Sequence, residues 1–178
     1  TRGHSDRVSA FSVLLGKYLG LSETDLRTLE VGGLFHDIGK IGIPDSILLK
    51  ESKLTDDEYS EIKNHPSIGA HILCNASIFQ DIIPIVKHHH ERFGGKGYPG
   101  KLKGEEIPYL ARVTAVADTF DAMTSKRTYR NALPLDVVKE EIADCSGTQF
   151  DPEIAKVFLD ILNNHYDEIK KIQEDFPA

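Results

Sequence analysis

Long apolar runs are absent from this sequence, and so is any excess of positive charge. Its apolar runs extend over only a few residues, whereas a helix needs ~20 apolar residues to cross a bilayer. The formal net charge is −7, which argues against non-specific attraction to nucleic acid or anionic membranes, because both depend on clustered Lys and Arg. We therefore expect no nucleic-acid polymer as partner and no membrane insertion. Any phosphate ligand must be held by local groups.

Cysteine is scarce as well. Cys74 and Cys145 lie far apart and form no CxxC pair, which fits a reducing compartment and gives no indication of a thiolate metal site. No basic segment followed by an apolar one opens the chain, so no export signal is expected. These features predict a cytoplasmic location.

The strict alternation that is typical of strands is also missing, whereas apolar residues recur at intervals of three and four. We therefore predict an all-α bundle of about seven helices, forming a single domain over residues 1–178. The expected helices run from His4 to a stop at Gly20, from Ser22, from Thr55 through His65 to Leu73 with a kink at Pro66, from Asp81 to Arg92, and from Pro108, Pro134 and Pro152.

One long irregular segment interrupts this pattern. Residues 93–104 hold five glycines and one proline within twelve positions. Loops of that length inside a compact domain are usually functional or disordered. We expect a long glycine-rich loop here.

Histidine, in contrast, is plentiful, and five of the eight fall between His65 and His90. Helical projection places four of the histidines and one aspartate on the apolar faces of their helices. A fifth histidine and a second aspartate, side by side, directly follow the apolar end of another helix. Five histidines and two aspartates are therefore expected to face inward. A buried carboxylate without a partner costs several kcal/mol or more, and Lys40 alone cannot neutralise two of them. The inward set is His4, His36, Asp37, His65, His89, His90 and Asp118.

Two interpretations of this set compete. A single buried histidine is more often an ordinary core residue that is hydrogen-bonded to a carbonyl, and we accept that for His71, His88 and His165. It is improbable that each of the seven residues has a separate polar partner of its own, whereas a shared metal centre satisfies all seven residues at once. Imidazole and carboxylate without thiolate suit Fe, Mn, Zn, Co or Ni, and seven ligands are too many for one ion. We infer at least two ions.

Six spaced motifs then carry a resemblance to a known family. They read GHSDRV at 3–8, HDIGKIGIPD at 36–45, NHPSIGAHIL at 64–73, HHERFGGKGYPGKLKGEEIP at 89–108, VADTFDAMTSKRTYR at 116–130 and GTQFDPEI at 147–154. In this order they resemble the HD-GYP domain, the branch of the HD phosphohydrolase superfamily that is associated with cyclic di-GMP hydrolysis.

The resemblance implies a role for each matching position. His4, His36, Asp37 and Asp118 would hold one divalent metal, and Asp37 would bridge to a second held by His65, His89 and His90. Iron and manganese are the common metals of the family, and some relatives bind a third ion. Lys40 would stand next to the attacked phosphate, and Tyr98 would contact the nucleotide. Arg127 and Arg130 would grip the substrate phosphates.

The function that follows from the resemblance is hydrolysis of cyclic di-GMP to pGpG, GMP or both in bacterial signalling. Two alternatives stay open: a cyclic di-GMP receptor or interaction module without strong turnover, and an HD phosphohydrolase for another nucleotide. The family signature has an aspartate where this chain has Gly94, which keeps the receptor alternative open. We also expect a linked sensory or receiver domain before Thr1, because the first helix starts almost at His4. A homodimer is compatible with the sequence.

Overall fold

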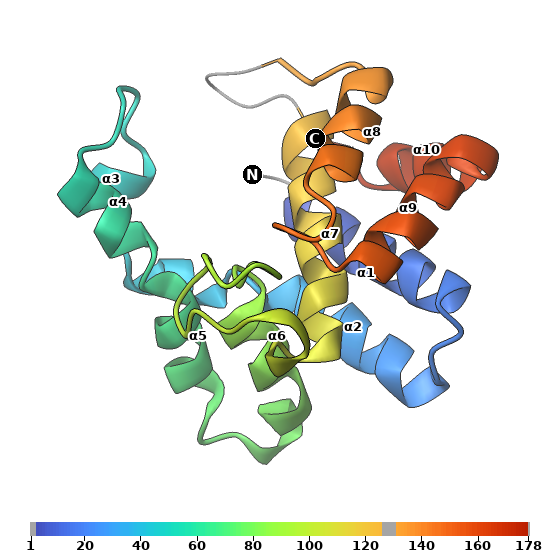
Figure 1. The fold of residues 1–178 in the computed structure, drawn as a ribbon. Helices are drawn as coiled ribbons and strands as arrows, with labels where there is room; N and C mark the ends of the chain where they lie inside the picture. Colours follow the sequence, from blue (N-terminus) through green and yellow to red (C-terminus); the bar gives the residue numbers. More distant parts are fainter. Residues whose placement is uncertain (1–2, 126–130, 178) are drawn as a thin grey trace.

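The structure is a computed structural model that describes residues 3–125 and 131–177, and it is built from helices (Figure 1). The α-helices are α1 (His4–Tyr18), α2 (Glu23–Phe35), α3 (Asp45–Leu48), α4 (Asp56–Ile62), α5 (His65–Leu73), α6 (Ile83–His88), α7 (Tyr109–Thr124), α8 (Leu135–Asp144), α9 (Pro152–Asn164) and α10 (Tyr166–Asp175). The 3-10 helices are η1 (Ile38–Gly42), η2 (Ser77–Ile82) and η3 (Gly104–Glu106). The all-α prediction is confirmed, and no named strand occurs in the described ranges.

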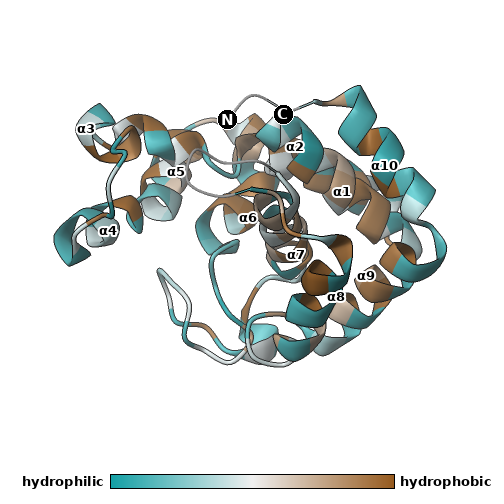
Figure 2. Cartoon of the chain, turned by 90° about the horizontal axis from the view of Figure 1, so that it is seen from above, coloured by the Kyte–Doolittle hydropathy of each residue, from teal (hydrophilic) through white to brown (hydrophobic). Residues whose placement is uncertain are grey.

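Helix α7 lies at the centre of the bundle, with α1 and α9 packed along it (Figure 1). Phe120 of α7 meets Phe11 of α1 and Phe158 of α9 edge-on, with ring centroids 5.1 and 5.0 Å apart. All three rings are fully buried. Figure 2 shows α7 in the middle of the bundle, with hydrophilic residues mainly on the outer sides of the helices around it. This core fixes the two helices that carry His4 and Asp118.

The helix starts follow the sequence signals closely. Ser22 accepts a hydrogen bond from the backbone N–H of Asp25, and Thr55 forms a reciprocal capping box with Glu58. Pro152 occupies the first turn of α9, where its missing N–H costs nothing. These predicted helix starts are confirmed.

Two predicted helices differ from the structure. The third is divided into α4 and α5, which break at Lys63 and Asn64 because Pro66 sits in the first turn of α5 and cannot continue the preceding helix. The fourth begins at Ile83 instead of Asp81, after η2, and ends at His88 instead of Arg92, because Glu91 N–H bonds to the carbonyl three residues back, that of His88, and does not continue the four-residue pattern. The described residues therefore hold more and shorter helices than the seven expected.

In the described part of the chain, no helix is both long and apolar enough to cross a membrane. Helices α3 and α4 project from one edge of the bundle (Figure 1).

A close backbone contact sets the geometry of the turn after α2. A Cβ atom added at Gly39 would lie 1.8 Å from the carbonyl oxygen of His65 and 2.5 Å from the backbone nitrogen of Gly69. Only glycine allows η1 to touch α5 this closely. The contact brings Asp37, just before η1, next to His65 at the start of α5.

Gly39→Ala is therefore expected to destabilise the protein by about 3 kcal/mol, because the new methyl group meets rigid backbone instead of a movable side chain. For a domain of this size the melting temperature should fall by roughly 6 to 12 °C. Gly42→Ala is the matched control, since its Cβ would meet only the side chain of Ile68. Thermal unfolding of the two variants measures the difference, and equal melting temperatures would contradict the close-contact argument.

Candidate metal centre

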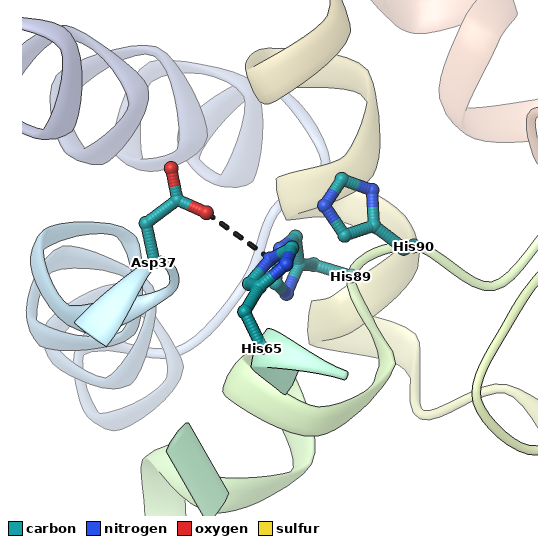
Figure 3. A group of neighbouring side chains, drawn as sticks. All are labelled: Asp37, His65, His89 and His90. Carbon is teal, nitrogen blue, oxygen red and sulfur yellow. Dashed lines mark ion pairs between the residues drawn. The ribbon is translucent and has the colours of Figure 1, made fainter. Parts of the chain in front are cut away.

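The structure brings together all seven residues that the sequence places inward. They form two groups, within each of which the candidate ligand atoms lie within 4.8 Å of one another. The first ligand group is His4, His36 and Asp118, and the second is Asp37, His65, His89 and His90. Figure 3 shows the second group, in which the side chains from three segments of the chain point toward a common centre.

Asp37 stands between the two groups. Its Oδ2 faces the first group, 3.4 Å from His36 Nε2 and 3.7 Å from His4 Nε2. Its Oδ1 faces the second group, 3.2 Å from His65 Nε2 (Figure 3). Each carboxylate oxygen thus serves a different group, as a bridging ligand would.

The orientation of four histidines is fixed through the nitrogen that points away from the centre. His36, His65 and His89 each place Nδ1 2.7 to 2.9 Å from a backbone carbonyl, those of Gly33, Ile62 and Val86 respectively. A carbonyl can only accept, so Nδ1 carries the proton and donates it. His4 Nδ1 donates to Asp121 at 2.7 Å. The Nε2 atom of each ring is therefore directed at the centre.

These Nε2 atoms test whether the residues fit a metal ion. Nε2 of His36, His65 and His89 is buried and has no hydrogen-bond partner among the described residues. Buried polar atoms in proteins are almost always satisfied, and an acceptor without a donor suits a cation. A second partner on Nδ1 is also the usual arrangement around metal-bound imidazole. The donor set therefore fits divalent metal ions.

The charge states of the aspartates and of two histidines fit metal binding, and His4 is the exception. Burial lowers the pKa of His4, but hydrogen bonds to Asp118 and Asp121 raise it to about 9. A metal ion would therefore have to displace a proton from His4 Nε2. Burial raises the pKa of Asp37 and of Asp118, but neighbouring histidines, joined by Lys40 at Asp37, outweigh burial and hold the pKa of each carboxyl well below its usual range. Burial lowers the pKa of His90 to about 4 and also lowers the pKa of His89. The aspartates are therefore ionised and these histidines neutral near pH 7, which are the forms that bind metals.

Sequence reasoning missed a buried ion pair behind His4. Asp121 is 1% exposed and receives Nε of Arg7 at 2.5 Å as well as Nδ1 of His4 at 2.7 Å. Arg7 also donates to the carbonyl of Phe176 at 2.8 Å. The signal was present in the sequence: Asp121 follows Asp118, and Arg7 follows His4, at the three-residue interval that places both members of a pair on one helix face.

A second missed residue organises the glycine-rich segment. The carboxylate of Glu91 is buried and accepts hydrogen bonds from the backbone N–H groups of Gly100 at 2.6 Å and Leu102 at 3.1 Å. His88 lies 3.4 Å from the same carboxylate and belongs to neither ligand group. The segment held by Glu91 carries Tyr98, whose ring stacks on His90 with centroids 4.9 Å apart.

A cavity of about 310 Å³ opens beside the two groups. Lys40 lines it and donates to Asp37 Oδ2 at 2.5 Å, so its charge stands at the ligand centre. Ala115 and Ala122 also line the cavity, which means that these small residues leave room for a ligand as well as for helix packing. Tyr98 lies at the cavity too. Arg127 and Arg130, expected to grip phosphates, fall outside the described residues.

This chain is similar to known proteins in its sequence and in its fold. A family model described as HD domain matches residues 1–154. A protein named cyclic di-GMP phosphodiesterase from Thermotoga maritima is 44% identical over 89% of this chain and 44% of its own length. A protein of Vibrio cholerae named 3'3'-cGAMP-specific phosphodiesterase 2 is 34% identical over 99% of this chain and 34% of its own length. The chain thus spans less than half the length of either relative.

A solved structure shares the fold. Bd1817 from Bdellovibrio bacteriovorus, described as an HDG"Y"P protein, superposes with a TM-score of 0.74 at 23% identity, covering 90% of this chain and 52% of that one. At this level of identity the likeness concerns the arrangement of helices alone.

Proposed function

This chain belongs to the HD domain family, and we propose on that basis that it is a metal-dependent phosphodiesterase that hydrolyses cyclic di-GMP to pGpG, GMP or both. The observation that supports this most directly is the pair of ligand groups joined by Asp37, with an open cavity beside them. Relatives named as cyclic di-GMP phosphodiesterases support the choice of substrate.

Each of the two ligand groups would hold one divalent ion. His4, His36, Asp118 and Asp37 Oδ2 would hold one divalent ion, and His65, His89, His90 and Asp37 Oδ1 the other, with iron or manganese as the expected metal. Divalent ions held there would supply Lewis-acid stabilisation of the phosphodiester and activation of the attacking water. Nothing in the arrangement of the described residues requires a third ion.

Lys40 and Tyr98 would act on the substrate directly. The ammonium group of Lys40 would offset negative charge that develops on the non-bridging phosphate oxygens. Tyr98, already stacked on His90, would offer its other face or its hydroxyl to the nucleotide. From the family resemblance, Arg127 and Arg130 would hold the phosphates by charge-assisted hydrogen bonds.

The function is tested by metal analysis and turnover together. Protein purified without oxygen, which protects ferrous iron, should contain about two transition-metal ions per chain. The loaded protein should convert cyclic di-GMP to pGpG or GMP, and removal of the metal by a chelator should stop the reaction. Tight binding of cyclic di-GMP by fully loaded protein without any product would favour the receptor alternative. Protein without transition metal under these conditions would contradict the metal centre.

A second substrate has specific support. Several relatives are named as 3'3'-cGAMP-specific phosphodiesterases, and one of them matches 99% of this chain. The same metal centre would cleave either dinucleotide, because both present a 3'–5' phosphodiester. Competition between the two substrates in one assay decides which is preferred.

Lys40→Ala and Tyr98→Ala are expected to affect different steps. Loss of the Lys40 charge should lower kcat about 100-fold to 1000-fold while changing Kd little, since its contribution grows as charge develops in the transition state. Tyr98→Ala should instead raise Kd about tenfold because it removes a stacking partner. Tyr98→Phe is the control that keeps the ring. The measurement is kcat and Kd for each variant, and a Kd effect of Lys40→Ala as large as its kcat effect would contradict the assignment.

A further inference from the structure

One wall of the cavity has no role in the proposed reaction. It is formed by Arg92, which follows α6, by Thr119 of α7, and by Gln149 in the turn before α9. These residues come from three separate parts of the chain and meet at the cavity that the ligand groups line.

Hydrogen bonds fix this wall. Gln149 Nε2 donates to Thr119 Oγ1 at 3.3 Å, which turns the amide oxygen of Gln149 toward Arg92. Arg92 Nη2 donates to that oxygen at 3.0 Å. The guanidinium of Arg92 is therefore oriented by a neutral amide and not by an acid. In the described part of the chain, no carboxylate lies within ion-pair distance of Arg92.

The backbone holds the same residues together. Phe93 N–H donates to the carbonyl of Gln149 at 3.1 Å, and Gly94 N–H donates to that of Thr148 at 2.8 Å. A Cβ atom at Gly94 would lie 3.1 Å from the carbonyl oxygen of Thr148, a tight contact that would push the two segments apart by a few tenths of an ångström. Glycine at position 94, where the family has aspartate, thus favours the close pairing that sets Gln149 beside Arg92.

The charge of Arg92 is available to a ligand. Among the described residues that line the cavity, Lys40 and Arg92 are the lysine and the arginine. Lys40 already donates a hydrogen bond to Asp37. A guanidinium has five N–H donors in a planar fork, and Gln149 uses one nitrogen of Arg92. Within residues 3–125 and 131–177, most of its donors therefore remain open on an exposed side chain that lines the cavity.

We propose that Arg92, oriented by Gln149 and Thr119, is a specificity residue that binds a pair of acceptor atoms on the cyclic dinucleotide away from the phosphate being cleaved. The inference rests on the proposed function. Two parts of the substrate carry such a pair: the O6 and N7 edge of a guanine base, and the second phosphate. Adenine offers N7 beside a donor, so it matches Arg92 less well than guanine does.

The test compares three cyclic dinucleotides on metal-loaded protein: cyclic di-GMP, 3'3'-cGAMP and cyclic di-AMP. Arg92→Ala should raise Kd and lower kcat/KM for cyclic di-GMP about tenfold to a hundredfold, the range for loss of a charge-assisted hydrogen bond. Lys96→Ala is the matched control, because it removes an exposed positive charge from the same segment without lining the cavity. Metal content and melting temperature are measured for each variant.

Gln149→Ala separates positioning from direct contact. If Gln149 acts through Arg92, its replacement should weaken binding by a smaller factor in the wild-type background and add nothing to Arg92→Ala. Losses that multiply in the double variant would show that Gln149 touches the substrate itself and would overturn its positioning role.

Each possible outcome supports one kind of contact or overturns the inference. A loss that is large for cyclic di-GMP and small for cyclic di-AMP supports contact with guanine, whereas equal losses for all three support contact with the second phosphate. If the wild type hydrolyses a cyclic dinucleotide and Arg92→Ala behaves like Lys96→Ala, the inference is overturned and the proposed function stands. If the loaded wild type binds and hydrolyses none of the three, the proposed function fails and the inference fails with it.

Discussion

Asp37→Ala is expected to lower turnover of cyclic di-GMP by at least about a thousandfold and to reduce bound metal in both ligand groups. The reason is its position, since one carboxylate oxygen faces His36 and His4 while the other faces His65. No other side chain in the described residues has its two ligand atoms turned to both groups in this way. Replacement of Asp37 should therefore lower turnover and metal content more than replacement of a ligand that serves a single group.

The measurement is metal content together with kcat, and circular dichroism should show unchanged helical content. His71→Ala is the control for loss of a histidine, because His71 belongs to neither ligand group and is exposed, so the expectation that it is a core residue was wrong. His89→Ala, which empties a position in only one group, should retain more metal than Asp37→Ala. Retention of both metals in Asp37→Ala would contradict the bridging role.

The inward set could be predicted from the sequence because helix periodicity carries that information directly. His4 shares a face with Val8 and Phe11 in α1, and those apolar residues are completely buried. The projection for His89 and His90 gave the right side although both residues lie beyond the end of α6. It succeeded because the chain continues in a tight turn there, so the direction of the side chains changes little.

Other parts of the site could not be predicted because they depend on contacts between distant segments. The anchoring of residues 100 and 102 by Glu91 requires the glycine-rich segment to fold back on the end of α6. The contact of Gly39 with the backbone of His65 requires η1 to pack on α5. Helical periodicity describes one helix at a time, so it cannot predict either of these contacts between distant segments. Composition likewise gives no hint that Arg92 and Gln149 meet.

The buried pair of Arg7 and Asp121 should matter almost as much as the metal ligands. Asp121→Ala is expected to lower the free energy of unfolding by about 3 to 5 kcal/mol, since it leaves the buried guanidinium of Arg7 without its carboxylate. It also removes the acceptor for Nδ1 of His4, so the imidazole loses its fixed tautomer and orientation. Loss of such a partner typically weakens metal binding about tenfold to a hundredfold.

Stability alone does not separate this positioning role from a purely structural one, and a second buried pair provides the comparison. Asp151 is 7% exposed and receives Nη1 of Arg112 at 2.6 Å, but it neither lines the cavity nor contacts a candidate ligand. Asp151→Ala should therefore reduce the melting temperature while leaving metal affinity unchanged. Asp121→Ala should reduce both, with the loss of affinity confined to one of the two ions, because His65, His89 and His90 do not touch Asp121. Metal titration of the two variants, at a temperature where both are folded, distinguishes the two roles. Equal metal affinities of the two variants would show that Asp121 has only a structural role.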